Sequence, residues 1–433
     1  MVIPRFFRGA ASLCLFSFAA VLVLVPTGYA ITALATCALA LVAGGWLLLS
    51  RPRRRGGNGR RLPMEERAGS LDSEDALWLG AVVLYALVWL ADVARSAEWP
   101  VGELGRGILL PLWPLLAALV ALAWRALPPS FTAWRLGVSL GALSACGMAL
   151  YERIALGHVR AGYFINSIPF GDLALLLGVL SAIALVDTLE DHRRHPLWRW
   201  WLGAAALAGL LASLLSGTRG GWISLPVLVW LWYGNFYRVV SRGTMITVSL
   251  VLALSLTVAV AVPHTGVAKR VDQAVDQVRG YFLAGEKATS VGIRLEMWRA
   301  GAHLIAEKPL IGWGEGGLQR RRNQLVDEGL IHRGVERYDQ LHSDLIDTTA
   351  RRGVVGLLSL LLLYGVPLVL FARRLSPDRS SEVRTLALSG VAVVAAFIDF
   401  GLTQTLLRDV HGLAGFLGLS AACWVLMRRA EYR

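Results

Sequence analysis

The sequence predicts an all-α polytopic membrane protein with about 12 transmembrane helices and one polar domain between helices 9 and 10. Of the 433 residues, 55% are hydrophobic and only 17% are charged, whereas soluble proteins are about 45–50% apolar and about 25% charged. The apolar residues form runs near the length of about 20 that a membrane helix needs. Residues 264–353 are polar instead. This pattern excludes a soluble enzyme, a disordered chain and a disulfide-linked scaffold.

The first two apolar runs are expected to form a helical hairpin. Arg5 and Arg8 precede the first run, and Pro-Thr-Gly-Tyr-Ala follows it, which is similar to a secretory signal peptide. A second apolar run begins almost at once, at Ile31. That proximity favours an uncleaved hairpin over a cleaved signal.

Twelve segments are apolar enough to be membrane spans, and charge gives their direction. They lie at residues 9–26, 30–49, 76–94, 108–125, 136–152, 168–187, 199–216, 221–237, 244–263, 354–372, 385–403 and 410–427. If the N-terminus is cytoplasmic, every cytoplasmic loop is basic, as the positive-inside rule requires. The net charge of +13 is thereby explained by topology rather than by nucleic acid.

The polar stretch at 264–353 is too long for a connector and too charged to span the membrane. We expect a small, mostly helical domain outside the cytoplasm. The chain then divides into 1–263 with helices 1–9, this domain at 264–353, and 354–433 with helices 10–12. The four cysteines fall inside apolar spans, so neither a disulfide nor a metal site is expected: Cys14, Cys37, Cys146 and Cys423.

Arg219 is the most distinctive charged residue on the predicted outer face. It lies in Ser216-Gly-Thr-Arg219-Gly-Gly, a polar break between two apolar helices. Its guanidinium binds phosphate oxygens through paired hydrogen bonds and stays charged at any relevant pH. For a lone arginine, a side chain that reaches toward lipid headgroups is the favoured interpretation. Several arginines on one face favour a clamp for a lipid phosphate or diphosphate.

Two further arginines share that face. Arg160 lies in the outer loop before the sixth span, and Arg294 lies four residues before Trp298, so a helix places both of the latter side chains on one face. The glycine-rich segment 307–317 suits a turn against a helix end. It lacks the Lys-Ser/Thr of a nucleotide-binding loop.

His342 lies where the polar stretch re-enters the membrane, in Leu341-His342-Ser343-Asp344. The ordinary pKa of histidine, about 6.5, suits proton transfer near neutral pH. From this residue alone, two roles stay open: a general base, or a histidine that caps a helix or faces headgroups.

Three segments together resemble motifs of the O-antigen ligase and polymerase superfamily of bacterial envelope proteins. They are Ser216 to Trp222, then Arg294 to Trp298 with Pro309 to Gly314, and finally His342-Ser343 with Gly353-Val-Val-Gly356. The family commonly has asparagine where Ser343 stands. Span number and the position of the large loop are most similar to the ligase branch.

The resemblance implies a glycosyltransferase of the bacterial inner membrane, and the residues predict that it is inverting and metal-independent, since neither a carboxylate nucleophile nor an acidic metal-binding motif is evident. It would move O-antigen polysaccharide from undecaprenyl diphosphate to the lipid A-core oligosaccharide on the periplasmic face. The residues suit this chemistry: Arg219, Arg294 and Arg160 would bind the donor diphosphate, and His342 would be the base for the acceptor hydroxyl. Membrane lipids are the remaining partners. No cofactor or nucleic acid is expected. No metal ion is expected either, because the first outer loop, 26–30, holds no carboxylate.

Other functions remain as alternatives. Within the family these are an O-antigen polymerase and a protein O-oligosaccharyltransferase. A lipid or solute transporter is of a different class, and acidic residues in or at the ends of spans are typical of one: Asp92, Asp172, Asp187 and Asp399. A non-catalytic envelope scaffold is a further alternative. A transporter has no evident need for the outer domain or for arginines and a histidine on one face, which favours glycosyl transfer.

Overall fold

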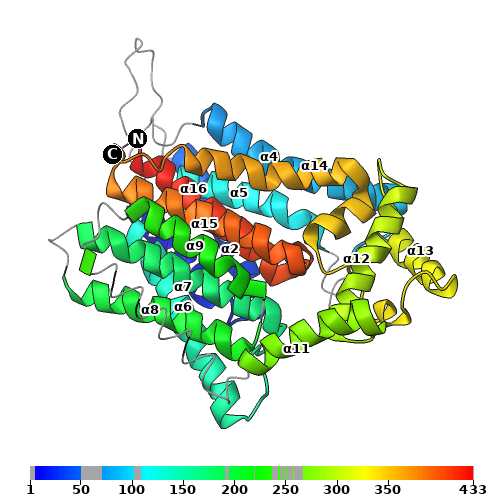
Figure 1. Ribbon diagram of the computed structural model, residues 1–433. Coiled ribbons are helices and arrows are strands. Elements are labelled where there is room, and N and C mark those ends of the chain that lie inside the picture. Colours follow the sequence, from blue (N-terminus) through cyan, green and yellow to red (C-terminus); the bar gives the residue numbers. More distant parts are fainter. Residues whose placement is uncertain are drawn as a thin grey trace.

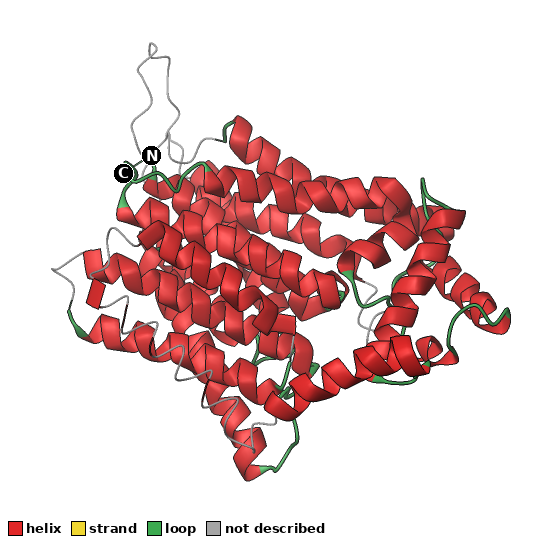
Figure 2. Cartoon of the chain, in the orientation of Figure 1, coloured by secondary structure: helices red, strands yellow, loops and turns green. Residues whose placement is uncertain are grey.

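A computed structural model describes residues 5–49, 71–101, 109–190, 195–218, 220–236 and 267–432, with isolated residues between 242 and 257. In this part of the chain the structure is helical and contains no strand (Figure 2). The bundle consists of α1 (Arg5–Val21), α2 (Gly28–Leu49), α4 (Ser73–Ser96), α5 (Trp113–Ala126), α6 (Phe131–Leu150), α7 (Ser167–Glu190), α8 (Leu197–Ser216), α9 (Gly220–Phe236), α14 (Asp344–Ala372), α15 (Ser381–Thr403) and α16 (Val410–Ala430). Beside it lie α11 (Val267–Arg279), α12 (Ser290–Glu307) and α13 (Glu315–Asp327) (Figure 1).

Nine of the described helices are long and apolar enough to cross a membrane. Two further expected spans correspond to α1 and α9, which are 17 residues long each. The expected span at 244–263 falls outside the described residues, apart from isolated positions. The all-α membrane fold is therefore confirmed, whereas the count of twelve stays a prediction.

Polar side chains set the starts of several helices. Asp72 accepts hydrogen bonds from the backbone N–H groups of Glu74 and Asp75, and Asp75 accepts one from the N–H of Asp72. This reciprocal pair satisfies amides that the first turn of α4 leaves without helical partners. Asp409 caps α16 by accepting hydrogen bonds from the N–H groups of His411 and Gly412 at 2.9 and 2.8 Å.

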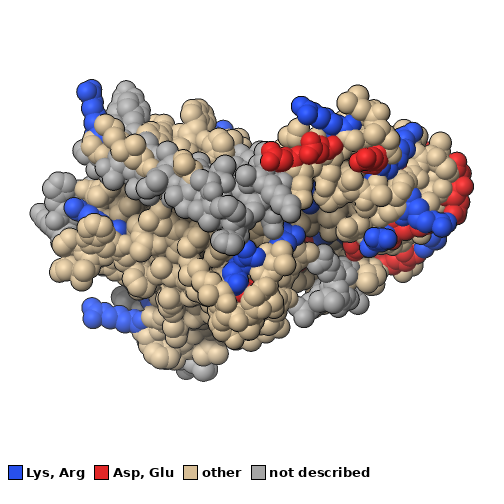
Figure 3. All heavy atoms as spheres, turned by 60° about the horizontal axis from the view of Figure 1, so that its bottom comes forward, with Lys and Arg blue, Asp and Glu red and all other residues tan. Residues whose placement is uncertain are grey.

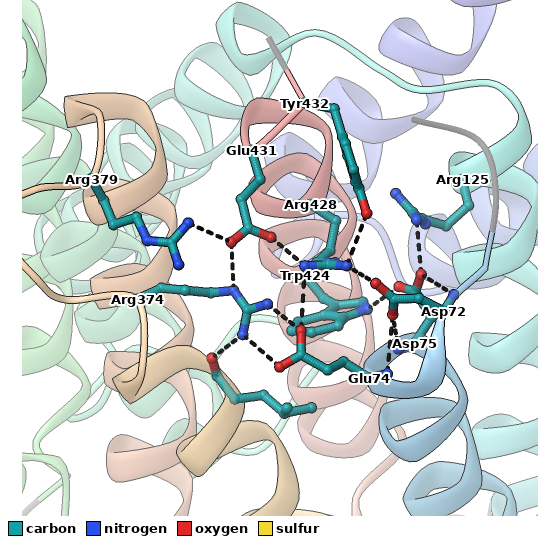
Figure 4. A network of polar contacts seen from close by, with 11 residues as sticks. Asp72, Glu74, Asp75, Arg125, Arg374, Arg379, Trp424, Arg428, Glu431 and Tyr432 are labelled. Atoms are coloured by element: carbon teal, nitrogen blue, oxygen red, sulfur yellow. Dashed lines mark hydrogen bonds and ion pairs between the residues drawn. The ribbon is translucent and has the colours of Figure 1, made fainter. Parts of the chain in front are cut away.

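Ion pairs join alternate helix ends at the end of the bundle where the N and C labels lie (Figures 1 and 4). Arg374, after α14, pairs with Glu74 of α4 and with Glu431 after α16. Arg428 of α16 pairs with Asp72, Glu74 and Glu431. The start of α4 and the ends of α14 and α16 therefore meet, as the predicted alternation of spans requires.

A buried ion pair links three more helices at that end. Arg135 of α6 and Asp187 of α7 lie 2.9 Å apart, and Ser381 of α15 donates to Asp187. The sequence places Arg135 in a cytoplasmic loop, but it lies inside α6 and is buried. Its charge is satisfied by Asp187, one of the acidic residues that raised the transporter alternative.

The region around α12 and α13 has a hydrophobic core of its own. Met297, Leu304, Leu318, Leu325 and Val335 are fully buried in it. Charged side chains gather over this end of the molecule, whereas the bundle beside it is largely uncharged on the face that Figure 3 presents. The predicted bounds of a separate domain at 264–353, and the side of the membrane on which it lies, stay predictions.

A kink in α14 joins this region to the bundle. Gly353 has φ 61° and ψ −157° within the helix, so the predicted span at 354–372 is the part of α14 beyond the kink. A Cβ on Gly353 would come within 2.2 Å of the backbone of Leu310, and one on Gly312 within 2.3 Å of the backbone of Arg351. The glycines thus let the segment 309–314 lie directly against the helix, as the sequence predicts.

Candidate active site

His342 lies where three parts of the chain meet: the turn before α14, the helix α12 and the break from α15 to α16. Gly301 allows the close contact with α12, because a Cβ there would come within 2.3 Å of Ile346. From the other side, the N–H of Leu407 donates to the Asp344 carboxylate at 3.2 Å. The site is therefore built from segments far apart in sequence.

The ring of His342 has a defined tautomer. Its Nδ1 lies within hydrogen-bonding distance of Oε1 of Gln404, the residue that ends α15. An amide oxygen only accepts, so Nδ1 carries the proton and Nε2 keeps its lone pair. Tyr338 packs edge-on against the same ring, with centroids 5.1 Å apart. Only 8% of the residue is exposed.

The backbone of His342 adopts a left-handed conformation, with φ 49°. Few residues other than glycine do so, and such conformations cost about 1–3 kcal/mol when the surroundings impose them. The neighbours on both sides supply that constraint. Asp347 accepts from the N–H of Leu341 at 3.0 Å, and the Ser343 hydroxyl donates to the Gly401 carbonyl at 3.2 Å.

The surroundings keep the imidazole neutral. Burial lowers the pKa of His342 below its usual value, and the positive charge of Arg294 lowers it further. The hydrogen bond to Gln404 and the charges of Asp347 and Asp339 oppose this shift without reversing it. The charge of Arg294, which the sequence analysis assigns to phosphate binding, therefore acts on the ring that it assigns to proton transfer.

A buried network of charges supports the turn that carries His342. Arg351, fully buried, donates to Asp347 at 2.8 Å and to Glu315 at 3.0 Å. Arg408 pairs with Glu315 at 2.9 Å, and the Trp89 indole also donates to Glu315 at 2.9 Å. Burial by itself raises the pKa of Glu315, but the arginines hold it far below its usual value. The glutamate is therefore ionised and joins α13, α14 and the segment before α16.

Arg160 contacts the end of α8, which is a different part of the chain from the segment that carries His342. Its Nε donates to the Ser216 carbonyl at 3.0 Å, at the end of α8 and three residues before Arg219. Close packing accompanies this contact, because a Cβ on Gly171 would meet the hydroxyls of Ser216 and Thr218. Arg160 is thus anchored at the break that carries Arg219. Arg219 itself falls outside the described residues, so its predicted role is untested.

The sequence did not predict a role for Gln404, nor the buried charge network around Glu315. Gln404 is 62 positions from His342, and an amide next to an apolar helix carries no periodic or motif signal. Arg408 did offer a signal, since it is a charged residue at the predicted outer boundary, where topology asks for none, whereas Glu315 lies within the polar stretch, where charge is ordinary. Ser343 makes no side-chain hydrogen bond that caps α14, and its hydroxyl contacts α15 instead.

Comparison with known proteins supports the resemblance. The family model of the O-antigen ligase domain matches residues 204–361, a range that contains Arg219, Arg294 and His342 but not Arg160. An uncharacterized protein of Haemophilus influenzae is 24% identical over 353 residues, which cover 81% of this chain and 86% of that protein. An O-antigen ligase of Escherichia coli is 24% identical over 233 residues, which cover 50% of this chain and 54% of that protein. Over residues 204–361, this chain is therefore similar to the O-antigen ligase family.

Proposed function

We propose that the protein is an O-antigen ligase in the strict sense: it transfers a polysaccharide from undecaprenyl diphosphate to lipid A-core oligosaccharide. The reaction takes place on the periplasmic side of the inner membrane. The match of residues 204–361 to the O-antigen ligase family model supports a glycosyltransferase-like role in the synthesis of O-antigen and lipopolysaccharide. The observation that carries the proposal is the neutral, tautomerically fixed His342 beside the charge of Arg294.

In this proposal His342 is the general base. Its Nε2 takes the proton from the acceptor hydroxyl as that oxygen attacks the anomeric carbon of the donor. The bond from this carbon to the diphosphate oxygen breaks, and undecaprenyl diphosphate leaves with the bonding electrons. One displacement of this kind inverts the configuration at the anomeric carbon.

The arginines would bind the diphosphate. Arg294, Arg219 and Arg160 supply fixed positive charge where negative charge grows as the bond breaks. Because a diphosphate is already a good leaving group once its charge is balanced, neither a metal ion nor a second carboxylate is required. Arg160 also donates to the Ser216 carbonyl, which would orient the break that carries Arg219.

The test compares His342→Ala with wild type using purified protein, lipid-linked glycan and rough lipopolysaccharide. We expect turnover to fall about 10²–10⁴-fold, the usual cost of losing a general base, while donor binding stays near wild type. His303→Ala, on the same helix as Arg294 but outside this site, is the matched control and should keep full turnover. A His342→Ala protein with near-normal turnover would rule out the proposed base.

A further inference from the structure

A small polar pocket lies beside His342, separated from its ring by Gln404. The side chains that line it come from the start of α7, the turn before α14 and the break between α15 and α16: Asn166, Asp339, Gln340, Gln404, Thr405 and Asp409. Its free space, including the open mouth, is about 310 Å³, at the lower end of small-molecule sites. The innermost space is only about 10 Å³, enough for one hydroxyl-sized group.

Thr405 gives the pocket an unsatisfied group. It is 1% exposed, and its hydroxyl has no hydrogen-bond partner among the described residues. A buried hydroxyl without a partner costs about 1–3 kcal/mol. A hydroxyl that enters the pocket from a ligand would remove that cost.

The charges of the pocket disfavour phosphate. Asp339 and Asp409 place two carboxylates in the lining. The one arginine there, Arg408, is already paired with Glu315 at 2.9 Å and lies 3.6 Å from Asp347. Carboxylate, amide and hydroxyl groups together are suited to the neutral hydroxyls of a sugar, which both donate and accept hydrogen bonds.

We propose that this pocket is a sugar subsite, in which a hydroxyl of one pyranose ring is bound by Thr405 while the ring lies at the mouth. The proposal rests on the glycosyl transfer proposed above. Gln404 belongs both to the pocket and to the hydrogen bond that fixes His342, so the bound ring lies next to the base. The ring belongs either to the acceptor core or to the donor glycan, because both offer the same hydroxyl chemistry.

The test replaces Thr405 with valine, which keeps the shape and removes the hydroxyl. Since that hydroxyl makes no internal hydrogen bond, the change should leave folding intact. Steady-state kinetics with each substrate varied in turn should show KM raised about tenfold for one of them, the value of one lost hydrogen bond. Thr405→Ser should restore the wild-type KM, and the pH profile should not move because His342 is unchanged. If the valine variant does not fold, the smaller Thr405→Ala replaces it.

Thr385→Val is the matched control. Thr385 is also 1% exposed with an unpartnered hydroxyl, but it lies in α15 about 27 Å from the end near Thr405. A raised KM for lipopolysaccharide identifies the acceptor sugar, and a raised KM for the lipid-linked glycan identifies the donor sugar. Unchanged values for both substrates, or the same change in Thr385→Val, would overturn the subsite. Loss of transfer in His342→Ala reports on the base separately.

Discussion

At the scale of single residues, the proposed role of His342 as a base depends on its neighbours Gln404 and Arg294. Two effects act on the ring. The hydrogen bond to Gln404 places the proton on Nδ1, and burial together with the charge of Arg294 lowers the pKa of the ring. A histidine that served only as a cation for phosphate would gain from the opposite arrangement, with a carboxylate as its partner. The contacts of His342 therefore favour the proposed general base over a cationic ligand for phosphate.

The lowered pKa of His342 predicts the acid limb of the pH profile. Transfer should increase with pH as the imidazole loses its proton and should level off above a midpoint below about 6.5. Gln404→Glu puts a carboxylate against Nδ1, stabilises the imidazolium and should shift this midpoint to higher pH. The rate of transfer measured from pH 4.5 to 8.5 checks both. Activity that falls with rising pH would show that histidine binds phosphate as a cation.

The planar shape of the arginine guanidinium predicts an effect on donor binding. Arg219→Lys and Arg294→Lys keep the charge but lose the planar fork that binds two phosphate oxygens at once. Each should weaken binding of the lipid-diphosphate donor, measured by titration, and reduce transfer. Arg333→Lys, at an exposed arginine in the η5 turn (Arg333–Arg337), should have no effect. Donor binding that is unchanged in both site variants would remove the proposed clamp.

At the scale of helices, the sequence predicts the positions of helices much better than it predicts the contacts between them. A membrane helix is a continuous apolar run, so α4, α7 and α15 could be placed from the sequence alone. The glycine-rich segment 307–317 also predicted a turn against a helix, but the kink at Gly353 inside α14 was not predicted. The pairing of Trp89 with Glu315, 226 residues apart, was not predicted either, since no pattern within either segment specifies its partner.

The charge network in Figure 4 predicts a stability difference between two arginines. The side chain of Arg374 is 6% exposed and pairs with Glu74 and Glu431, whereas that of Arg379 is 49% exposed. Arg374→Ala removes a buried arginine from a network in which Glu74 and Glu431 keep Arg428 as a partner, and it should destabilise the fold by about 1–3 kcal/mol. Arg379→Ala should cost about 0–1 kcal/mol. Unfolding in detergent measures both, and equal effects would contradict the role assigned to burial.

For the whole molecule, the alternation of helix ends agrees with a chain whose termini share one side and whose α11–α13 region lies at the other end (Figure 1). Absolute orientation comes only from the arginine-rich loops of the sequence. In a cysteine-free background, a membrane-impermeant thiol reagent should label Ala288→Cys from outside intact spheroplasts and spare Gly57→Cys. The reverse pattern would invert the topology and place the active site in the cytoplasm.

The most direct test of the central claim is transfer by the purified protein in detergent. Lipid-linked glycan and rough lipopolysaccharide are supplied with EDTA and without an ion gradient, and product masses are measured. We predict a product whose mass equals the acceptor plus the glycan, with undecaprenyl diphosphate released and the new linkage inverted. Donor chains that lengthen one another would identify a polymerase. No transfer without a metal ion, or movement of substrate only across a membrane with a gradient, would contradict the account.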